Sequence, residues 1–591
     1  MAPGDRLISG RAIWAIVGLF ILTLTLGSMT VNAANGPVAP ITPSLCIDSS
    51  YCAPPDTIPY KLASAARLTG YFVDSVFGSN NNSGKSDVRA WRSLSKAKKS
   101  ELPVGADVWF KTGQESSNTI GVTWGCTEND RCILGTYWMN DGIETRGLPS
   151  GGNPGSKYTP QSSWEGHTFV GTYPKGFSKK TKNISAIKAV SGYVTVENLN
   201  CWKQNGLCIS VDKDSYGHNI FDNVMSYING IEVYVANRDD EFGGFNEVKN
   251  SEFYEVASCW RDEIMTGCRE LNGWPKCTGH VRSSNNSFHN NLVELCSGEG
   301  SGNTEEGGNN RIHDNIFIGT RGLCMYVNGG HDNVFERNIC IGGGRQSWAD
   351  GYERATGDTG GFFSMSWESN GYRKGGAMVG NVFKNNLGIG VKSCLGWGVS
   401  SVPGSDGFST MGLEYIGNTC LLAGQSIFST NNIGPESAQV FSAGSVVIAN
   451  NIFGARNPID GDKDGFDAYQ PANCVPKNDI SNGYVVVFDN LLEGEKWDDP
   501  DCAGSSGLEN VGAGLQGKSG DAIDYSLAGP GAIADGTRRF GFNDVCIGAA
   551  SKAIGNGVRS SKIVGLTRDA LNNPRGTGTT DIGAVLRASC F

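Results

Sequence analysis

The sequence predicts an all-β protein, a right-handed parallel β-helix solenoid with a short N-terminal capping helix. Three observations support this: a repeated asparagine phrase, very short apolar strands, and an unusual composition. Glycine makes up 83 of 591 residues while only 18% are charged, and the usual glycine share is about 7%. Glycine and asparagine tolerate left-handed backbone, so a chain that turns many times needs many of both.

The repeat is an apolar residue or two, then an asparagine, then an alternating apolar pair. The shorter intervals between its asparagines are 23, 24, 25 and 27 residues, which is typical of one solenoid coil per repeat. Strands such as 194–196 and 485–487 are too short to bury their inward side chains unless coils stack in parallel. We expect each asparagine to take left-handed backbone at a tight turn and to bond to its counterpart one coil away. The repeat asparagines are Asn198, Asn223, Asn250, Asn291, Asn315, Asn338, Asn386, Asn418, Asn451 and Asn490.

Two long intervals predict insertions near 254–282 and 343–378 within a β-helix that spans 70–591. The second interval is also long enough to contain an extra coil without an asparagine. Its aromatic residues are candidate substrate-binding groups, because the apolar faces of sugar rings pack on aromatic rings. The alternative is that these rings fix a long loop to the solenoid. The four candidates are Trp348, Tyr352, Trp367 and Tyr372.

The N-terminus predicts export. Arg6 and Arg11 precede an apolar run over 12–31, and small residues follow, so residues 1–33 match a secretory signal peptide. The run is also long enough to be a retained membrane anchor. Residues 34–69 form a Pro- and Cys-containing extension before the solenoid.

The cysteines also indicate an oxidising compartment. All 18 follow the signal segment, and the close pairs Cys46/Cys52, Cys126/Cys132 and Cys201/Cys208 are typical of disulfides. No Cys-x-x-Cys spacing occurs, which argues against structural zinc. The net charge of −10 argues against nucleic acid or an anionic membrane as a partner. We therefore expect a secreted or cell-surface protein.

The ends and centre of the predicted solenoid resemble secreted right-handed parallel β-helix proteins of the pectate-lyase-like superfamily. The opening stretch runs from Tyr71 to Phe110 and includes Gly78-Ser79-Asn80-Asn81-Asn82 and Trp91-Arg92-Ser93-Leu94. The centre resembles the family's coil consensus near Gly298-Glu299-Gly300 and 322–338, and the closing stretch 569–585 is similar to its C-terminal segment. The resemblance covers roughly residues 70–585 and implies the fold, with an N-terminal capping helix at about 93–99, rather than one function. Such proteins include lyases, epimerases, hydrolases and uncharacterised members.

Lyases of this fold need a base and a cation that neutralises the uronate carboxylate. The sequence departs from the alginate-lyase pattern, since Leu323-Cys324-Met325-Tyr326 stands where those enzymes carry basic residues. The central coils still offer charged groups that can line a groove. The alternative is a solvated face with structural Arg–Glu pairs. The candidate catalytic residues are Glu299, Glu306, Arg321, His331 and Arg337.

Two motifs suggest a metal. His289 and His313 are 24 residues apart, so they can stack in adjacent coils or share a metal. The stretch 459–467 alternates Asp with Gly, a spacing that lets carboxylates converge on Ca²⁺. A plain acidic loop is the alternative there. The predicted calcium ligands are Asp460, Asp462, Asp464 and Asp467.

Together these patterns predict an exported, carbohydrate-directed protein whose partner is a polysaccharide or surface glycan. The expected chemistry is that of a uronate lyase or epimerase. The alternative is a non-catalytic structural or adhesive solenoid that binds glycan or neighbouring cells. A substrate groove is expected over the sheet near residues 294–345.

Overall fold

The computed structural model describes residues 68–510 with gaps. The gaps are 94, 97–101, 117–119, 141, 147–168, 171–186, 203–207, 212–216, 228–243, 255–282, 295, 297–298, 305–306, 321, 342–360, 368–377, 390, 392, 400–410, 424–425, 432–440, 456–469, 473–484, 489 and 494–507. The predicted signal peptide, most of the extension and the closing stretch 569–585 lie outside the described residues. Among the described residues, no helix has the length and apolar character needed to cross a bilayer.

The described strands form three faces, which we call A, B and C. Face A is a 14-stranded sheet of β1 (Tyr71–Val73), β2 (Val108–Lys111), β5 (Cys132–Asn140), β9 (Val194–Glu197), β12 (Ile220–Asp222), β14 (Glu247–Lys249), β16 (Ser287–His289), β19 (Arg311–His313), β22 (Val334–Glu336), β25 (Met378–Lys384), β28 (Met411–Ile416), β31 (Phe441–Ala449) and β34 (Val485–Phe488), with β6 (Ile143–Arg146) antiparallel to β5. Face B is a 13-stranded sheet of β3 (Glu115–Ser116), β7 (Phe169–Val170), β10 (Asn200–Trp202), β13 (Met225–Tyr227), β15 (Glu252–Tyr254), β17 (Leu292–Glu294), β20 (Ile316–Ile318), β23 (Ile339–Ile341), β26 (Leu387–Ile389), β29 (Thr419–Ala423), β32 (Ile452–Ala455), β35 (Asn490–Glu493) and β36 (Leu508–Asn510).

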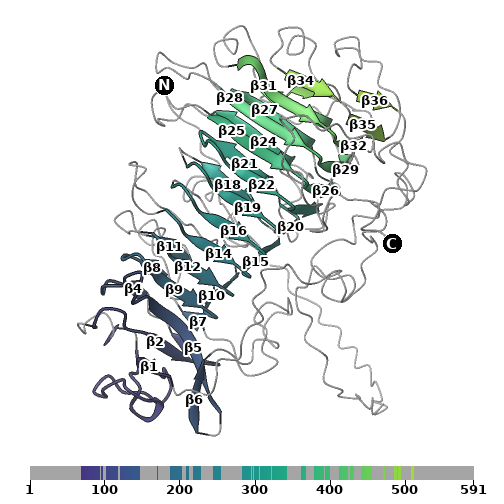
Figure 1. Cartoon of the computed structure of the whole chain (residues 1–591). Coiled ribbons are helices and arrows are strands. Elements are labelled where there is room, and N and C mark those ends of the chain that lie inside the picture. Colours follow the sequence, from purple (N-terminus) through teal and green to yellow (C-terminus); the bar gives the residue numbers. More distant parts are fainter. Residues whose placement is uncertain are drawn as a thin grey trace, which may run out of the picture. The chain divides into compact units, whose positions relative to one another are not determined.

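Face C consists of two smaller sheets. The 3-stranded sheet contains β4 (Ile120–Val122), β8 (Ile187–Ala189) and β11 (Ile209–Val211). The 6-stranded sheet contains β18 (Ser301–Thr304), β21 (Leu323–Asn328), β24 (Gly361–Trp367), β27 (Ser393–Val399), β30 (Ser426–Asn431) and β33 (Gln470–Ala472). The successive strands β21, β22 and β23 lie on faces C, A and B, and the same order recurs in the following coils. Figure 1 shows the strands stacking coil upon coil. Apart from β6 and β33, which pair antiparallel with β5 and β30, the described strands pair in parallel with their counterparts, so the parallel β-helix is confirmed.

Side-chain alternation on face A explains both the core and the surface. In β14, β16 and β19 the middle residue is buried and its two neighbours point outward. Parallel pairing places the middle residues Val248, Phe288, Ile312, Phe335 and Phe383 in one inward column. The strands therefore bury one apolar side chain per coil and leave two outward columns free for polar residues.

Buried asparagines join the coils at the turn from face A to face B. The backbone N–H and Nδ2 of Asn315 both donate to Oδ1 of Asn338, at 3.1 and 3.0 Å. Nδ2 of Asn338 donates in turn to Oδ1 of Asn386 at 3.0 Å. This direct bond shows that the interval from 338 to 386 is one coil with a long insertion, so the extra coil considered from the sequence is wrong. The ladder runs through Asn291, Asn315, Asn338, Asn386, Asn418, Asn451 and Asn490.

At Asn198 and Asn223 the expectation is confirmed, because both are left-handed and Asn223 Nδ2 donates to Asn198 Oδ1 at 2.6 Å. From Asn291 onward the left-handed position and the ladder position are different residues, which corrects the expectation there. Positive φ falls on the residue before the ladder, as at Asn290, Asp314 and Arg337. In the early coils the repeat asparagines Asn198, Asn223 and Asn250 occupy this left-handed position instead. The ladder position there is apolar or serine, and the Ser251 hydroxyl accepts from the Val224 N–H at 3.1 Å. Both positions favour asparagine, so the sequence repeat does not distinguish the left-handed position from the ladder position.

A second asparagine ladder, which the sequence analysis missed, joins the coils at the turn into face A. The N–H of Asn310 donates to Oδ1 of Asn333 at 3.0 Å, and its Nδ2 donates to the same oxygen at 3.1 Å. Asn333 bonds in the same way to Asn381. The members are Asn219, Asn246, Asn286, Asn310, Asn333 and Asn381. From the coil of Asn286 to that of Asn381, where both ladders run, each coil is therefore fixed to the next on both sides of face A.

The opening stretch forms the first described coil. Asp74 accepts from the N–H groups of Val76 and Phe77 and from Lys111 Nζ, at 3.0, 2.8 and 3.0 Å. A short 3₁₀ helix, η2 (Asp87–Arg89), follows. Of the capping helix expected at 93–99, Ser95 and Lys96 are helical, and residue 94 and residues 97–99 lie outside the described residues.

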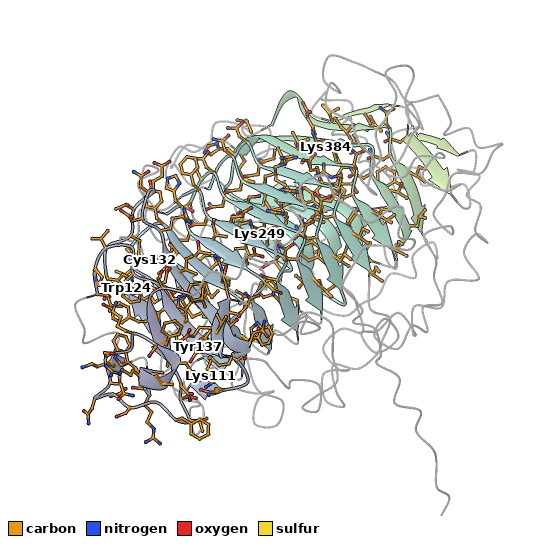
Figure 2. The ribbon with its side chains drawn as sticks, turned by 60° about the horizontal axis from the view of Figure 1, so that its bottom comes forward. Lys111, Trp124, Cys132, Tyr137, Lys249 and Lys384 are labelled. Atoms are coloured by element: carbon orange, nitrogen blue, oxygen red, sulfur yellow. A yellow bond between two sulfur atoms is a disulfide. The ribbon has the colours of Figure 1, made fainter. Side chains whose placement is uncertain are left out.

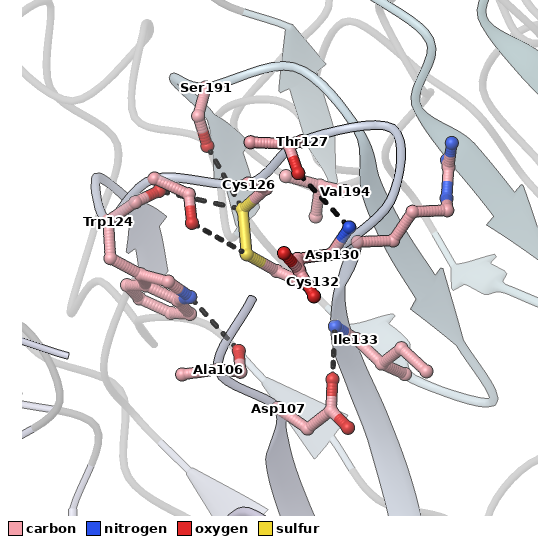
Figure 3. Close-up of a disulfide and its surroundings, with 12 residues drawn as sticks. Ala106, Asp107, Trp124, Cys126, Thr127, Asp130, Cys132, Ile133, Ser191 and Val194 are labelled. Atoms are coloured by element: carbon pink, nitrogen blue, oxygen red, sulfur yellow. Dashed lines mark hydrogen bonds between the residues drawn. A yellow bond between two sulfur atoms is a disulfide. The ribbon is translucent and has the colours of Figure 1, made fainter. Parts of the chain in front are cut away.

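Four disulfides are described: Cys126–Cys132, Cys201–Cys208, Cys324–Cys340 and Cys394–Cys420. Two of the three pairs expected from sequence spacing are confirmed, and Cys46/Cys52 lies outside the described residues. Figure 3 shows the Cys126–Cys132 bridge beside Trp124, whose Nε1 donates to the Ala106 carbonyl at 3.0 Å. The bridge closes the loop that leads into β5.

We predict that Asn338→Ala lowers the free energy of unfolding by about 2–4 kcal/mol, because buried partners above and below lose their hydrogen bonds. Urea denaturation of the purified chain measures this. Asn81→Ala is the matched control, since Asn81 is exposed and its side chain is in no ladder. An equal, small effect of both substitutions would contradict the role of the ladder.

We predict that Asp107→Asn stabilises the fold above pH 6. Burial raises the pKa of Asp107 to about 6, although the hydrogen bond from the Ile133 N–H, at 2.9 Å, acts to lower this pKa. An acid with a raised pKa in the folded state contributes stability below about pH 4 that is lost as the pH rises through about 6. An amide keeps the acceptor oxygen, so the gain at pH 7 should be about 1–2 kcal/mol, with none at pH 3. Thermal unfolding at both pH values tests this, with exposed Asp130→Asn as control.

Candidate functional site

The outward side of face A carries a continuous group of polar side chains between β14 and β25. Register pairing places Ser287 between Glu247 and Arg311 in one column. A second outward column beside it pairs Lys249, His289, His313, Glu336 and Lys384. We call these two columns, together with Asp314 and Arg337 of the adjoining turn, the polar columns. Figure 2 labels Lys249 and Lys384, which lie in their first and last strands. The ten members are Glu247, Lys249, Ser287, His289, Arg311, His313, Asp314, Glu336, Arg337 and Lys384.

One end of the polar columns is built around Glu247. Its Oε1 lies 2.8 Å from His289 Nε2, and its Oε2 accepts from Lys249 Nζ at 2.9 Å. The hydrogen bond from His289, together with Lys249, outweighs burial and lowers the pKa of Glu247 to about 2. Glu247 is therefore ionised at any ordinary pH.

The centre joins a histidine, a carboxylate and an arginine. His313 Nδ1 lies 2.6 Å from Asp314 Oδ2, and Arg337 donates to both oxygens of Asp314, at 2.8 and 2.7 Å. Burial alone would raise the pKa of Asp314, but these bonds lower it to about 2. Burial lowers the pKa of His313 below its ordinary value, although Asp314 opposes this effect. At neutral pH the imidazole is therefore neutral and the carboxylate is charged.

The other end is built around Glu336, which is buried among three cations. Arg311 donates through Nε at 2.8 Å and also through Nη2, while Lys384 Nζ lies 3.5 Å away. Arg337 Nη1 lies 3.2 Å away. Burial opposes ionisation, but these cations lower the pKa of Glu336. The Arg311 side chain is 53% exposed, so its cation remains accessible from outside.

The spacing of His289 and His313 allowed either stacked rings or a shared metal, and the structure shows stacked rings. The rings of His289 and His313 stack with centroids 4.8 Å apart and planes 3° apart. Each ring has its own carboxylate partner, Glu247 for one and Asp314 for the other. Within the described parts of the chain, no three or more His, Cys, Asp or Glu side chains converge as metal ligands.

Three of the five candidate catalytic residues are described, and they lie at different turns. Glu299 precedes face C strand β18, His331 lies between β21 and β22, and Arg337 lies between β22 and β23. His331 pairs with its neighbour Asp332 at 2.8 Å. Only Arg337 belongs to the polar columns. Glu306 and Arg321 lie outside the described residues.

The other candidates stay predictions. Trp367 is the last residue of β24, but its side chain is not described. The remaining aromatic candidates Trp348, Tyr352 and Tyr372 and the calcium candidates Asp460, Asp462, Asp464 and Asp467 lie outside the described residues. Coil register brings together residues that are 23 to 42 positions apart, so the sequence did not predict the roles of Glu247, Ser287, Arg311, Asp314 and Glu336.

Comparison with known proteins assigns the chain to no family. No family model matches it, and no curated protein matches it. Among solved structures it is similar to the pectate lyase Pel9A, at 14% identity and a TM-score of 0.43 over 88% of this chain and 97% of that one. It is also similar to the alginate lyase from Paenibacillus sp. str. FPU-7, at 14% identity and a TM-score of 0.34 over 55% and 92%. The GH136 lacto-N-biosidase from Eubacterium ramulus matches at 12% identity and a TM-score of 0.38 over 72% and 68%. Similarity at this level does not define an activity.

We predict an acid-dependent loss of stability that Glu247→Gln reduces. A carboxylate with a lowered folded-state pKa contributes stability above its unfolded pKa, 4.5 for Glu, that is lost as the pH falls towards 2. Because Glu247 is partly exposed, its share is roughly 1–2 kcal/mol. Urea denaturation at pH 7, 4 and 2.5 should show a shallower acid decline for Glu247→Gln than for the unsubstituted chain. Identical declines would show that the His289 and Lys249 contacts contribute nothing.

Proposed function

We propose that this chain is an exported, carbohydrate-directed β-helix protein that holds an acidic polysaccharide along face A, with uronate lyase or epimerase activity. The observation that carries the proposal is the set of cations in the polar columns. The polar columns contain four cations and three carboxylates. The cations are Lys249, Arg311, Arg337 and Lys384, and they pair with the carboxylates of Glu247, Asp314 and Glu336. In a chain of net charge −10, this leaves a local positive excess.

The geometry of stacked strands suits an extended anionic polymer. Neighbouring strands lie about 4.8 Å apart, a spacing comparable to one sugar unit of an extended glycan. Charged groups on successive strands can therefore meet the carboxylates of successive uronates. Arg311 is the best placed to do so, because it is about half exposed and guanidinium binds carboxylate through paired hydrogen bonds.

The chemistry of a uronate lyase or epimerase starts with removal of the proton beside the sugar carboxylate. A neutral base takes the proton, and a cation stabilises the charge that develops on the carboxylate. Face A offers a neutral imidazole at His313 and guanidinium groups at Arg311 and Arg337. Calcium at 460–467 and sugar contacts by the aromatic candidates belong to the same proposal. Four described disulfides support export to an oxidising compartment.

A non-catalytic adhesive solenoid is the second candidate. The observation that favours it is that Glu247, Asp314 and Glu336 are all ion-paired and have lowered pKa values. Such carboxylates are ionised near neutral pH, so they do not suit the role of a general acid. A glycan would then be held without being cleaved.

We predict that the purified chain binds polyuronates and that Arg311→Ala weakens this binding by about 5- to 50-fold, as expected for a lost charge-assisted bond. Affinity electrophoresis in polyuronate gels measures binding, and ultraviolet absorbance of a new C=C bond measures elimination. Arg92→Ala is the control, because Arg92 is exposed and lies outside the polar columns.

The two readouts separate the candidates. Binding together with new absorbance supports the lyase, and binding with a change only in uronate stereochemistry supports the epimerase. Binding without any product supports the adhesive solenoid. No binding to any polyuronate, or equal loss in Arg311→Ala and Arg92→Ala, would contradict the assignment of face A.

A further inference from the structure

We propose that Ser287, His313 and Asp314 form a nucleophile–base–acid triad on face A that hydrolyses carboxylic esters. Ser287 Oγ lies 3.4 Å from His313 Nε2, and His313 Nδ1 lies 2.6 Å from Asp314 Oδ2. This is the arrangement of an activated serine: a hydroxyl beside one ring nitrogen and a carboxylate on the other. The activity goes beyond the proposed binding or elimination of uronates.

The hydrogen bonds define the tautomer that a triad needs. An ionised carboxylate only accepts hydrogen bonds, so the short contact to Asp314 places the imidazole proton on Nδ1. Nε2 then carries the lone pair that receives the Ser287 proton. The Asp314 carboxylate is itself fixed by two bonds from Arg337, which hold the ring orientation. Burial favours the neutral ring, as a general base requires.

The neighbouring coil shows that stacking alone does not produce this arrangement. His289 occupies the same column, but its Nε2 bonds to Glu247 and not to a hydroxyl. The residues paired with Ser287 on either side are Glu247 and Arg311. Among the described histidines of face A, only His313 has a serine hydroxyl beside Nε2 and a carboxylate bonded to Nδ1.

A cation stands next to the nucleophile. Arg311 is the direct register partner of Ser287, one strand away, and its guanidinium is half exposed. A carbonyl oxygen of an ester held at Ser287 becomes negatively charged during attack, and a nearby positive charge stabilises it. Arg311 therefore supplies the electrophilic group of the site.

The reaction proceeds in two balanced steps. Ser287 Oγ bonds to the ester carbonyl carbon while its proton moves to His313 Nε2, and the bond to the alcohol oxygen breaks as that oxygen takes the proton. Water then attacks the acyl-serine and gives a proton to Nε2, which returns it to Oγ as the free acid leaves. An ester fits better than an amide because its alcohol is the better leaving group. Acyl or alkyl esters on a glycan lying along face A are the matching substrates.

The test uses the full purified chain with p-nitrophenyl acetate and, separately, with a fluorophosphonate probe. We expect release of p-nitrophenol that falls at least about 100-fold in Ser287→Ala, and a single phosphonate adduct that peptide mass spectrometry locates at Ser287. Ser83→Ala is the matched control, since Ser83 is an exposed serine of the first coil. Thermal unfolding of both variants verifies that they are folded.

Hydrolysis unchanged in Ser287→Ala, or no adduct at Ser287, would overturn the triad. Neither readout uses a polysaccharide, so the test of Ser287 does not depend on whether the chain binds polyuronates. Conversely, uronate elimination without ester hydrolysis or labelling would retain the proposed function and reject the esterase.

Discussion

The structure depends on the pairing of buried asparagine amides between successive coils. Each amide oxygen accepts both the backbone N–H and the amide group of its counterpart, as between Asn315 and Asn338. A buried amide without such partners would destabilise the fold. Because the bonds run between equivalent residues, they fix the register of one coil on the next. The ladders at both ends of face A leave its strands no freedom to slip by a residue.

Because the register is fixed, the single outward residues of successive coils line up in columns whose side chains contact one another. A three-residue strand has one inward and two outward side chains, so a coil adds only two polar groups to face A. Stacking brings those groups within contact of their neighbours at the strand spacing of about 4.8 Å. Charges of both signs then neutralise one another, as Glu336 does with Arg311 and Lys384. Where one partner is half exposed, as at Arg311, its charge remains accessible to a ligand even though it is paired with Glu336.

The sequence predicted the coil but only part of the site. Period and strand length were sufficient for the parallel β-helix, since such short strands bury their inward side chains only when coils stack. The asparagines were identified, yet the offset between Asn250 and Ser251 needs backbone angles to detect. The catalytic candidates come from one stretch of the chain, but a coil distributes neighbouring residues over three turns, so Glu299 and His331 lie apart. Asp314 follows His313 in the sequence, but Ser287 and His289 come from the preceding coil, and only the spacing between the two histidines signalled this.

The two stacked histidines show how much depends on the partner that each coil supplies. Both rings lie in the same column and in nearly the same orientation. His289 bonds through Nε2 to Glu247 in the preceding coil, and this bond keeps the carboxylate ionised. His313 bonds through Nδ1 to Asp314 in its own turn, which leaves Nε2 facing the Ser287 hydroxyl. The difference follows from two positions in the repeat: Asp314 stands where the preceding coil has Asn290, and Ser287 stands where the coil before it has Glu247, so the residue beside each ring nitrogen decides whether the imidazole forms an ion pair or faces a hydroxyl.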